Sequence, residues 1–314
     1  MTKKEQYRKL CEARNDIPVF LQCWWLDAVC GDDWDVAIAQ KGEHITGVWP
    51  YHIVTKAGVA ILRNPKLTPY LGPHIFLPGD IKQSNADGFE HETVSELLSQ
   101  IPKTKVWHLA MQPGFKQAGI MKTQGLEIHV QQTFLIDLKA EELTLFGNLK
   151  ENLRRNLRAT EKEFEISNDP KYINELYSFQ QLTLKGKGVT QAHSLPEMER
   201  LMQACLEHNC VALWVAKEAG KVQAIVWNVW DSERSYYFMG AQNPGSESYK
   251  AMSQLLWHTI KESAKRWNTI FDMEGSMDPG VEHFFRGFGG KRELYMVVKK
   301  SESLLWKLKE LVRG

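Results

Sequence analysis

Residues 212–230 read ALWVAKEAGKVQAIVWNVW, and residues 35–51 read DVAIAQKGEHITGVWPY. Each stretch begins with an apolar run, passes a glycine and continues into a second apolar run, which is typical of a β-hairpin. Gly42 corresponds to Gly220, 178 positions later (220 − 42), and the same spacing separates a tryptophan in each second run. We therefore expect one hairpin to occur twice in the chain.

The order of elements around the two hairpins is also the same. An amphipathic helix precedes each hairpin, and a helix, a strand, a short helix begun by Pro-Gly and a final strand follow it. The final strands are expected within 126–138 and 292–298. The sequence thus predicts an α/β (α+β) protein with two tandem copies of one unit, each a mixed, mostly antiparallel sheet flanked by helices.

The composition is that of an ordinary globular protein. Of the 314 residues, 43% are hydrophobic and 25% are charged, and the net charge of +1 argues against a broad nucleic-acid surface. The first ten residues contain no apolar segment, and no apolar run reaches the roughly 18 residues that a membrane span needs. We expect a cytoplasmic protein without a transmembrane segment.

Cysteine usage predicts neither a disulfide nor a metal site. The number of cysteines is odd and their spacing follows no disulfide pattern, which is typical of reduced thiols. Cys205, His208 and Cys210 lie close in sequence, but the fourth ligand of a zinc site is missing. The five cysteines are Cys11, Cys23, Cys30, Cys205 and Cys210.

Residues 271–290, FDMEGSMDPGVEHFFRGFGG, contain the best candidates for catalysis. Asp272 and Glu274 share one face of the expected strand, at a strand end where α/β sheets bind ligands. They could accept the proton of an amine, or they could be solvated or cap the next helix. His283 on that helix could face them, and Tyr295 could donate a proton to a leaving group. Structural roles remain open for both side chains.

A basic line runs along the expected helix that links the two halves. Like charges four residues apart repel by about 0.2–0.5 kcal/mol per pair, so this line favours bound phosphate. A solvated helix balanced by neighbouring glutamates is the alternative. Arg286 could also hold a phosphate or could pair with an acid. The linker residues are Lys150, Arg154, Arg158 and Lys162, with Arg155 beside them.

Two glycine-containing segments are further candidates. Gly240 ends an aromatic strand, where a distorted backbone could direct N–H groups at an oxyanion, although a simple turn is the alternative. Lys185 and Lys187 flank glycines in 184–193, LKGKGVTQAH, which would suit a mobile acceptor-site loop. The same letters also fit an ordinary surface loop.

Several segments of the second half together match the pattern of a known family. They are SYYFMGA (235–241), LLW (255–257), FDMEGS (271–276) and 281–289, with the basic NLRRNLRATEK (152–162) before them. They resemble the FemAB-like acyltransferases of the GNAT-fold superfamily. In the first half, WWL (24–26) and PKLTPYLG (65–72) are similar to the same family.

The resemblance implies two tandem GNAT-like domains and transfer of an acyl group to an amine. It implies a degenerate domain at 1–140, a second domain at 141–300 with a basic linker helix at 145–164, and an amphipathic helix at 301–314. We expect an acyl or aminoacyl N-transferase that acts on a cell-envelope or polysaccharide precursor. The alternative is a catalytically inactive GNAT-like protein that binds a ligand or tRNA.

The donor stays open between acyl-CoA and aminoacyl-tRNA, and no other cofactor is expected. The usual GNAT pyrophosphate loop is replaced by NPGSES at 243–248, and the family's Phe-Lys pair is replaced by Phe284-Phe285. Small-molecule or glycan-precursor substrates, and possible tRNA binding, follow from the same resemblance. The helix at 301–314 could lie on a membrane surface or pack on its own protein.

Overall fold

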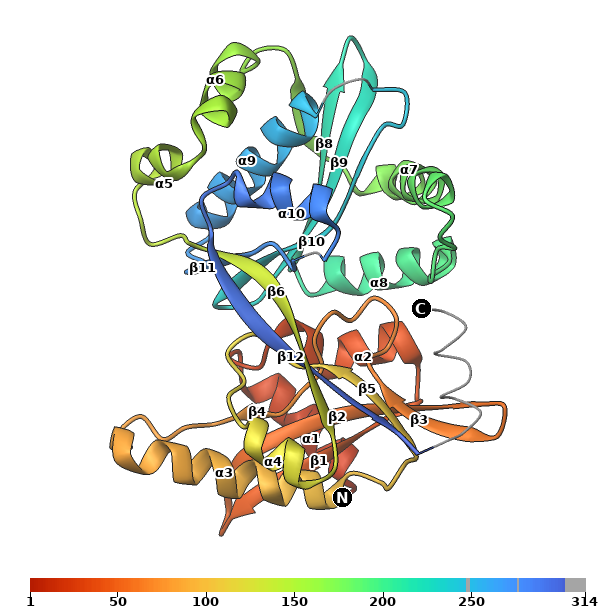
Figure 1. Cartoon of the computed structure of the whole chain (residues 1–314), viewed down its shortest axis with the longest axis vertical. Coiled ribbons are helices and arrows are strands. Elements are labelled where there is room, and N and C mark those ends of the chain that lie inside the picture. Colours follow the sequence, from red (N-terminus) through yellow and green to blue (C-terminus); the bar gives the residue numbers. More distant parts are fainter. Residues whose placement is uncertain (247–248, 276, 303–314) are drawn as a thin grey trace. The chain divides into compact units, whose positions relative to one another are not determined.

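The computed structural model describes residues 1–246, 249–275 and 277–302 (Figure 1). The chain forms two compact units. Unit 1 holds residues 1–131 and the described residues from 294 onward, and unit 2 holds the described residues of 132–293. The amphipathic helix expected at 301–314 lies outside the described residues from position 303 on.

Unit 1 is a mixed sheet with strand order β1-β2-β3-β5-β12. All neighbouring strands are antiparallel except β3 and β5, which are parallel, and the two-residue β4 also pairs with β2. The strands are β1 (Trp34–Lys41), β2 (His44–Lys56), β3 (Val59–Arg63), β4 (His74–Ile75), β5 (Val106–Ala110) and β12 (Lys291–Ser301).

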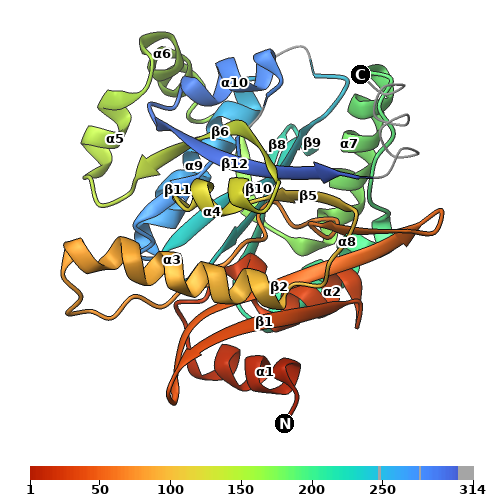
Figure 2. The ribbon, with the colours of Figure 1, turned by 60° about the horizontal axis from the view of Figure 1, so that its bottom comes forward.

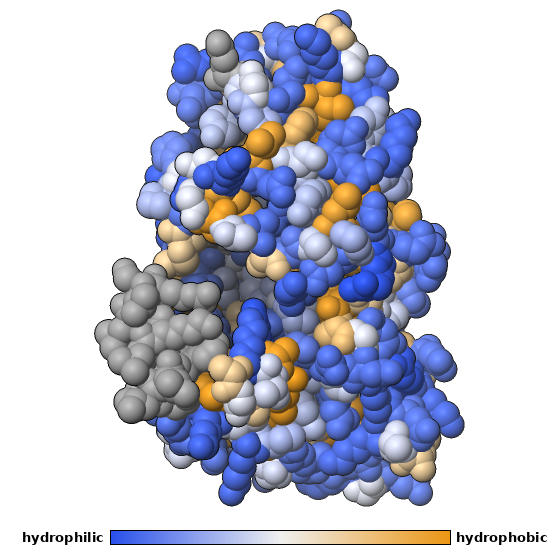
Figure 3. Space-filling view, turned by 90° about the vertical axis from the view of Figure 1, so that its right-hand side faces the viewer, coloured by the Kyte–Doolittle hydropathy of each residue, from blue (hydrophilic) through white to orange (hydrophobic). Residues whose placement is uncertain are grey.

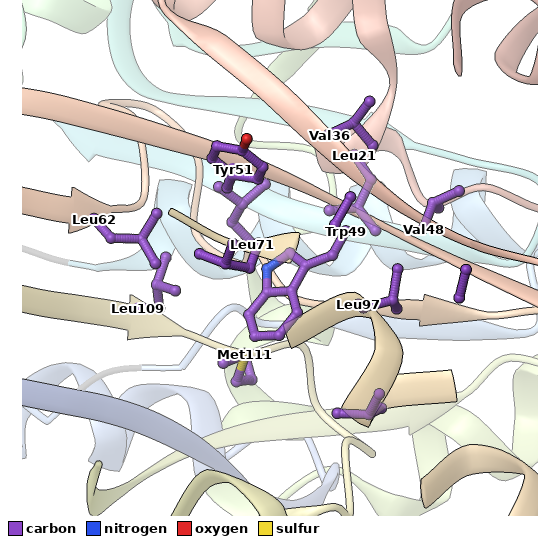
Figure 4. Packing of buried hydrophobic residues seen from close by; sticks show 14 of the residues in the cluster. Leu21, Val36, Val48, Trp49, Tyr51, Leu62, Leu71, Leu97, Leu109 and Met111 are labelled. Carbon is purple, nitrogen blue, oxygen red and sulfur yellow. The ribbon is translucent and has the colours of Figure 1, made fainter. Parts of the chain in front are cut away.

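The helices of unit 1 cover this sheet. Helices α1 and α3 contact β1, and α3 also contacts β2, along which it runs in Figure 2. Figure 4 shows Trp49 of β2 in the core of the unit, among Leu71, Leu97 and Met111. The helices are α1 (Lys3–Ala13), η1 (Val19–Leu21), α2 (Cys23–Cys30), α3 (Gln83–Gln100) and α4 (Ala118–Thr123).

Unit 2 repeats the architecture with strand order β6-β11-β10-β9-β8-β7. Strands β10 and β11 are parallel. The other strand pairs are antiparallel, namely β11-β6, β10-β9, β8-β9 and β7-β8. The strands are β6 (Glu127–Asp137), β7 (Glu165–Asn168), β8 (Val211–Glu218), β9 (Lys221–Trp230), β10 (Arg234–Gln242) and β11 (Ile270–Asp272).

Helices flank this second sheet as well. Helix α9 packs on β8 and β9, whereas α7 packs on β10, and Figure 1 shows α9 on one side of these strands and α7 with α8 on the other. The helices are α5 (Glu142–Asn148), α6 (Glu151–Ala159), η2 (Pro170–Tyr172), α7 (Ile173–Gly186), α8 (Leu195–Glu207), α9 (Lys250–Lys265) and α10 (Pro279–Arg286). The expected tandem α/β architecture is confirmed.

The two hairpins have the same register, with one correction. Each hairpin has a bulge in its first strand, which follows Ala39 in the first hairpin and Ala216 in the second. Two residue pairs and a two-residue turn come after each bulge. Equivalent positions are therefore 177 residues apart (216 − 39), not 178. Gly42 is the first residue of its turn and Gly220 is the second, so the glycines that suggested the alignment are not equivalent.

The final strands are exchanged between the units. Residues of β6 pair with β11 in unit 2, with Ile136 opposite Phe271, and residues of β12 pair with β5 in unit 1, with Val298 opposite Leu109. The compact units therefore differ from the expected domains at 1–140 and 141–300. Both strands have similar patterns, so sequence order alone does not identify the partner of either strand.

The basic linker is two short helices rather than one helix over 145–164. Leu149 and Lys150 are extended between α5 and α6, with ψ of 148° and 144°. The Lys150 backbone N–H donates to the Gly287 carbonyl at 2.9 Å. In a continuous helix this N–H would instead donate to the carbonyl four residues earlier. Lys150 is thus the N-cap residue of α6, outside the line that Arg154 and Arg158 form.

The surface gives no sign of a membrane span. No helix in the described part of the chain is both long and apolar enough to cross a bilayer. The face drawn in Figure 3 is mainly hydrophilic and is interrupted by small apolar patches. Peripheral membrane contact stays a prediction.

Candidate active site

In unit 2 the parallel pairing of β10 with β11 stops where β11 ends, and this end of β11 is named the opening of the strand pair. Strand β10 pairs with β11 at three positions, the last being Tyr236 opposite Asp272. Strand β11 ends there, whereas β10 continues to Gln242. The end of a strand in an α/β sheet is a position where ligands commonly bind.

The part of β10 beyond the last pair is bulged. Tyr237 lies opposite Asn228, but Met239 lies opposite Trp227, so the register against β9 shifts between them. A Cβ atom added at Gly240 would lie 1.8 Å from the Tyr237 hydroxyl. The observed position of the tyrosine therefore requires glycine at 240. The close approach expected at Gly240 is thus made by the protein's own tyrosine, and an oxyanion role for this backbone stays a prediction.

Asp272 is fully buried at the opening. Its Oδ1 accepts a hydrogen bond from Thr133 Oγ1 at 2.6 Å and another from the Glu274 backbone N–H at 2.8 Å. Its Oδ2 lies 3.8 Å from Arg234 Nη1 and has no hydrogen-bond partner among the described residues. Burial raises the pKa of the carboxyl to about 6, although the Thr133 hydrogen bond opposes this shift.

Glu274 lies beside Asp272, but not on the strand face that the sequence predicts. Its φ is 53°, and Gly275 follows with φ of 64°, so the chain turns directly after β11. A side chain at Gly275 would meet the Gln132 carbonyl oxygen at 1.9 Å, so this turn requires glycine. The Asp272 carboxylate stabilises the left-handed turn, because it binds the Glu274 N–H.

The Glu274 carboxyl is also kept from ordinary solvation. Its Oε1 is buried without a hydrogen-bond partner in the described part of the chain. Burial, and then the negative charge of Asp272, raise the pKa of Glu274 well above its usual value. After burial, the charge of Glu274 also raises the pKa of Tyr237, which places the phenol beside this acid.

Thr133 and Arg234 are site residues that the sequence did not indicate. Thr133 lies on β6, the strand expected to complete the first domain, so its contact with Asp272 depends on the strand exchange. Arg234 begins β10, and nearby Tyr236 donates to Asp231 Oδ2 at 3.0 Å. The sequence signal nearest to Thr133 is the alternating pattern of 126–138. This pattern identifies a strand, but it does not show that Thr133 contacts Asp272.

His283 and Arg286 both lie on α10, and Arg286 Nη1 lies 3.9 Å from Glu282 Oε1 of the same helix. Both side chains are exposed on α10, and Arg286 Nη2 lies 3.1 Å from His283 Nδ1. The buried residue of this helix is Phe285, which packs on Tyr237 with ring centroids 5.3 Å apart. No contact among the described residues joins His283 to either acid, and a catalytic role for His283 stays a prediction.

Tyr295 lies in unit 1, whereas the acids lie in unit 2. Its hydroxyl donates to Gln131 Oε1 at 2.7 Å, and its ring packs edge-on against Tyr70 at 5.2 Å. A catalytic role for Tyr295 stays a prediction.

The linker basics divide into two groups. Arg154 Nη1 donates to the Gly147 carbonyl at 2.7 Å, and the Arg158 guanidinium lies 5.2 Å from the Phe146 ring centroid, so both contact α5. Arg158 is nevertheless exposed, as are Lys150, Arg155 and Lys162. Phosphate binding by these residues stays a prediction.

The expected acceptor loop is connected to α10. Lys187 Nζ lies 2.6 Å from Asp278 Oδ2, and Asp278 Oδ1 accepts from the Gly280 N–H at the start of the helix. Lys185 is exposed in the last turn of α7. The loop that replaces the pyrophosphate loop is described to Ser246, and its positions 247 and 248 lie outside the described residues.

The equivalent position of unit 1 is filled by the chain itself. Strand β3 ends at Arg63, opposite His108, where unit 2 has Tyr236 opposite Asp272. The next residue, Asn64, accepts a hydrogen bond from the Ala110 N–H at 2.8 Å. No acid stands in β5 at the positions of Asp272 and Glu274, which supports the expectation of a degenerate first unit.

A separate pocket of about 240 Å³ also lies in unit 2. It is lined mainly by apolar residues of β6, α5 and α9, and Asp137, Asn148 and Lys291 are its polar lining residues. None of the expected site residues lines it.

Comparison with known proteins finds a family match in the second half of the chain and solved structures of similar fold. Residues 147–286 match the family model described as an acetyltransferase (GNAT) domain. No curated protein matches the chain. The structure is similar to the crystal structure of FemX, with a TM-score of 0.66 and 10% identity over 100% of this chain and 99% of that chain.

Two further solved structures have related folds. The C-terminal domain of a putative lysylphosphatidylglycerol synthetase from Agrobacterium fabrum has a TM-score of 0.56 and 13% identity, over 94% of this chain and 91% of that chain. A tandem GNAT protein from the clavulanic acid biosynthesis pathway has a TM-score of 0.53 and 6% identity, over 96% and 95%. The chain therefore has a fold similar to those of FemX and of this tandem GNAT protein, and its residues 147–286 match a GNAT acetyltransferase domain.

Proposed function

We propose that the protein is an N-transferase that moves an acyl or aminoacyl group to an amine of a cell-envelope or polysaccharide precursor. The observation that carries the proposal is the carboxyl pair Asp272–Glu274 at the point where β10 and β11 separate. Each acid has a buried oxygen without a hydrogen-bond partner among the described residues. Unpaired buried acceptors are costly, and they are found where a ligand or a proton completes the site.

Glu274 is the better candidate for the proton acceptor. An amine attacks an acyl carbonyl only as the free base, so its ammonium form must first lose a proton. Glu274 is partly exposed, and burial raises its pKa well above the usual value, which makes its carboxylate a stronger base than an ordinary glutamate. Asp272 is enclosed, and it acts as a positioning residue because it holds the Glu274 backbone.

The transfer step then needs a place for negative charge. The amine nitrogen bonds to the carbonyl carbon, the carbonyl oxygen becomes an oxyanion, and the carrier departs with a proton as the tetrahedral intermediate collapses. Backbone N–H groups of the β10 bulge around Tyr237 and Met239 would stabilise the oxyanion.

The neighbours represent two donor classes. The name lysylphosphatidylglycerol synthetase points to aminoacyl transfer to a membrane lipid, whereas the structure of the clavulanic acid protein is described as being without AcCoA, which points to a CoA donor. An aminoacyl-tRNA donor would use the exposed Lys150, Arg155 and Lys162 for its phosphates.

A thermal-shift panel tests the proposal and separates the donors. Acetyl-CoA, alanyl-tRNA and a UDP-linked amino sugar are added singly, since a ligand that binds the native state raises the melting temperature by mass action. Each stabilising donor is then assayed for transfer to the amino sugar with the wild type, Glu274→Gln and the exposed control Glu199→Gln. If the wild type is active and Glu274→Gln has the same turnover as the wild type, Glu274 is not the proton acceptor.

The second candidate function is binding without catalysis. It is favoured by the same exposed basic group, which needs no chemistry to hold tRNA. Stabilisation by a donor together with no transfer to the amino sugar would support this alternative.

A further inference from the structure

The pocket of about 240 Å³ in unit 2 has a wall made by residues 287–290, which follow α10. A Cβ atom added at Gly289 would lie 2.4 Å from the Asn148 carbonyl oxygen at the end of α5, and Gly289 has a φ of 77°, so this position requires glycine. A Cβ atom added at Gly290 would lie 3.2 Å from the Leu135 carbonyl oxygen on β6. The wall therefore packs closely on both α5 and β6, and the pocket is a built feature of this unit.

The base of the pocket belongs to the hydrophobic core of unit 2. Trp257 and Ile260 of α9 and Phe288 of the wall are buried. The Trp257 ring lies 5.7 Å from the Phe146 ring of α5, and the Phe288 ring lies 5.3 Å from the Phe284 ring. These contacts restrict both rings, so the base offers a preformed apolar surface to a ligand.

The polar lining residues carry both signs of charge. Asp137, Asn148 and Lys291 are exposed, so they stand at the mouth of the pocket, above the apolar base. Asp137 Oδ1 accepts a hydrogen bond from the Lys139 N–H at 3.0 Å. Within the described ranges of the chain, neither Asp137 nor Lys291 forms an ion pair with another side chain. Both charges are therefore available to a ligand.

We propose that this pocket binds a free apolar α-amino acid. The ammonium group of the ligand binds Asp137, its carboxylate binds Lys291, and its side chain packs on Trp257 and Phe288. A ligand with a carboxylate alone would face the like charge of Asp137, and a ligand with an amine alone would face that of Lys291, so the pair of charges selects a zwitterion.

The size and the place of the pocket agree with such a ligand. Its volume of about 240 Å³ lies just below the range of pockets that hold drug-sized molecules, which suits a molecule as small as an amino acid. None of the residues assigned to the transfer reaction lines the pocket. This inference therefore does not depend on the proposed function.

Isothermal titration calorimetry with the full chain at pH 7 tests the proposal. L-phenylalanine and L-leucine are titrated first, and at least one of them should bind saturably with one site per chain. Two analogues of L-phenylalanine then test each charge, since 3-phenylpropionate lacks the ammonium group and L-phenylalaninamide lacks the carboxylate. Each analogue should bind at least about tenfold more weakly than the tightest amino acid, because it loses a charge-assisted hydrogen bond.

Two charge variants assign these losses to residues. Asp137→Asn keeps an acceptor for the Lys139 N–H, and it should weaken amino-acid binding at least about tenfold without weakening that of 3-phenylpropionate. Lys291→Gln should weaken amino-acid binding to the same degree without weakening that of L-phenylalaninamide. The exposed Lys221→Gln on β9 is the control and should bind like the wild type.

Three results would overturn the proposal. They are no saturable binding of either amino acid, an analogue that binds as tightly as the amino acids, and a charge variant that keeps wild-type affinity. If a charge variant does not fold, the comparison of the amino acids with the two analogues on the wild type decides the matter.

Discussion

Thr133 Oγ1 donates a 2.6 Å hydrogen bond to Asp272 Oδ1 across 139 positions of sequence, and both groups are fully buried. This bond connects the strand that follows unit 1 to the acid at the opening of unit 2. It also opposes the effect of burial, since it stabilises the ionised carboxylate. The strand exchange therefore contributes directly to the charge state of the proposed site.

Replacing Thr133 by Val removes this donor and keeps the side-chain shape. The pKa of Asp272 should rise further, and the unfolding free energy at pH 7 should fall by about 1–3 kcal/mol, because a buried acceptor loses a partner. Urea unfolding measures the change, with the exposed Thr183→Val as the control. If neither variant changes the free energy of unfolding, the hydrogen bond makes no net contribution to stability.

Replacing Gly240 by Ala tests the packing of the bulge. The new Cβ would lie 1.8 Å from the Tyr237 hydroxyl and 2.5 Å from the ring carbon that carries it. We expect a loss of about 1–3 kcal/mol of unfolding free energy. Adding Tyr237→Phe should restore part of this loss, since it removes only the closer contact. Gly186→Ala, where no atom lies within 4 Å of the new Cβ, is the control and should be neutral or stabilising.

The sequence predicted the repeated unit because its evidence is local. Alternation around Gly42 and Gly220 identifies two hairpins, and the acids at 272 and 274 follow from their position after a short strand. It did not predict the exchange of β6 and β12, because strand pairing depends on contacts between distant segments. For the same reason Thr133 was missed, and the left-handed turn at Glu274 was missed because it depends in part on a hydrogen bond from its N–H to the Asp272 carboxylate.

The linker shows a second limit of sequence reasoning. The spacing of Lys150, Arg154 and Arg158 predicts one basic stripe on one helix. The hydrogen bond from the Lys150 amide to the Gly287 carbonyl instead ends α5 and starts α6. A tertiary contact of this kind overrides helix propensity.

Charge reversal in the linker should separate the exposed basic residues from the packed one. Lys150→Glu/Arg155→Glu should weaken tRNA binding at least about tenfold and reduce its salt dependence, while stability stays unchanged. Arg154→Gln should lower stability because its bond to the Gly147 carbonyl is lost. Filter binding across a salt series measures the first effect, with Lys221→Glu as a distant control. Equal tRNA affinity in all variants would exclude the linker as the donor site.

Asp272 should make the protein more stable as the pH falls from about 6 towards 4. Its folded-state pKa of about 6 lies above its ordinary value of 3.8, so between these values the native state holds a proton that the unfolded state has lost. Linkage makes the unfolding free energy decrease as the pH rises through this window, by up to about 3 kcal/mol in total. Asp272→Asn cannot titrate, so its stability curve should be flatter than that of the wild type between pH 4 and 6. Chemical denaturation at half-unit pH steps compares the two, and parallel curves would show that Asp272 has an ordinary pKa in the folded protein.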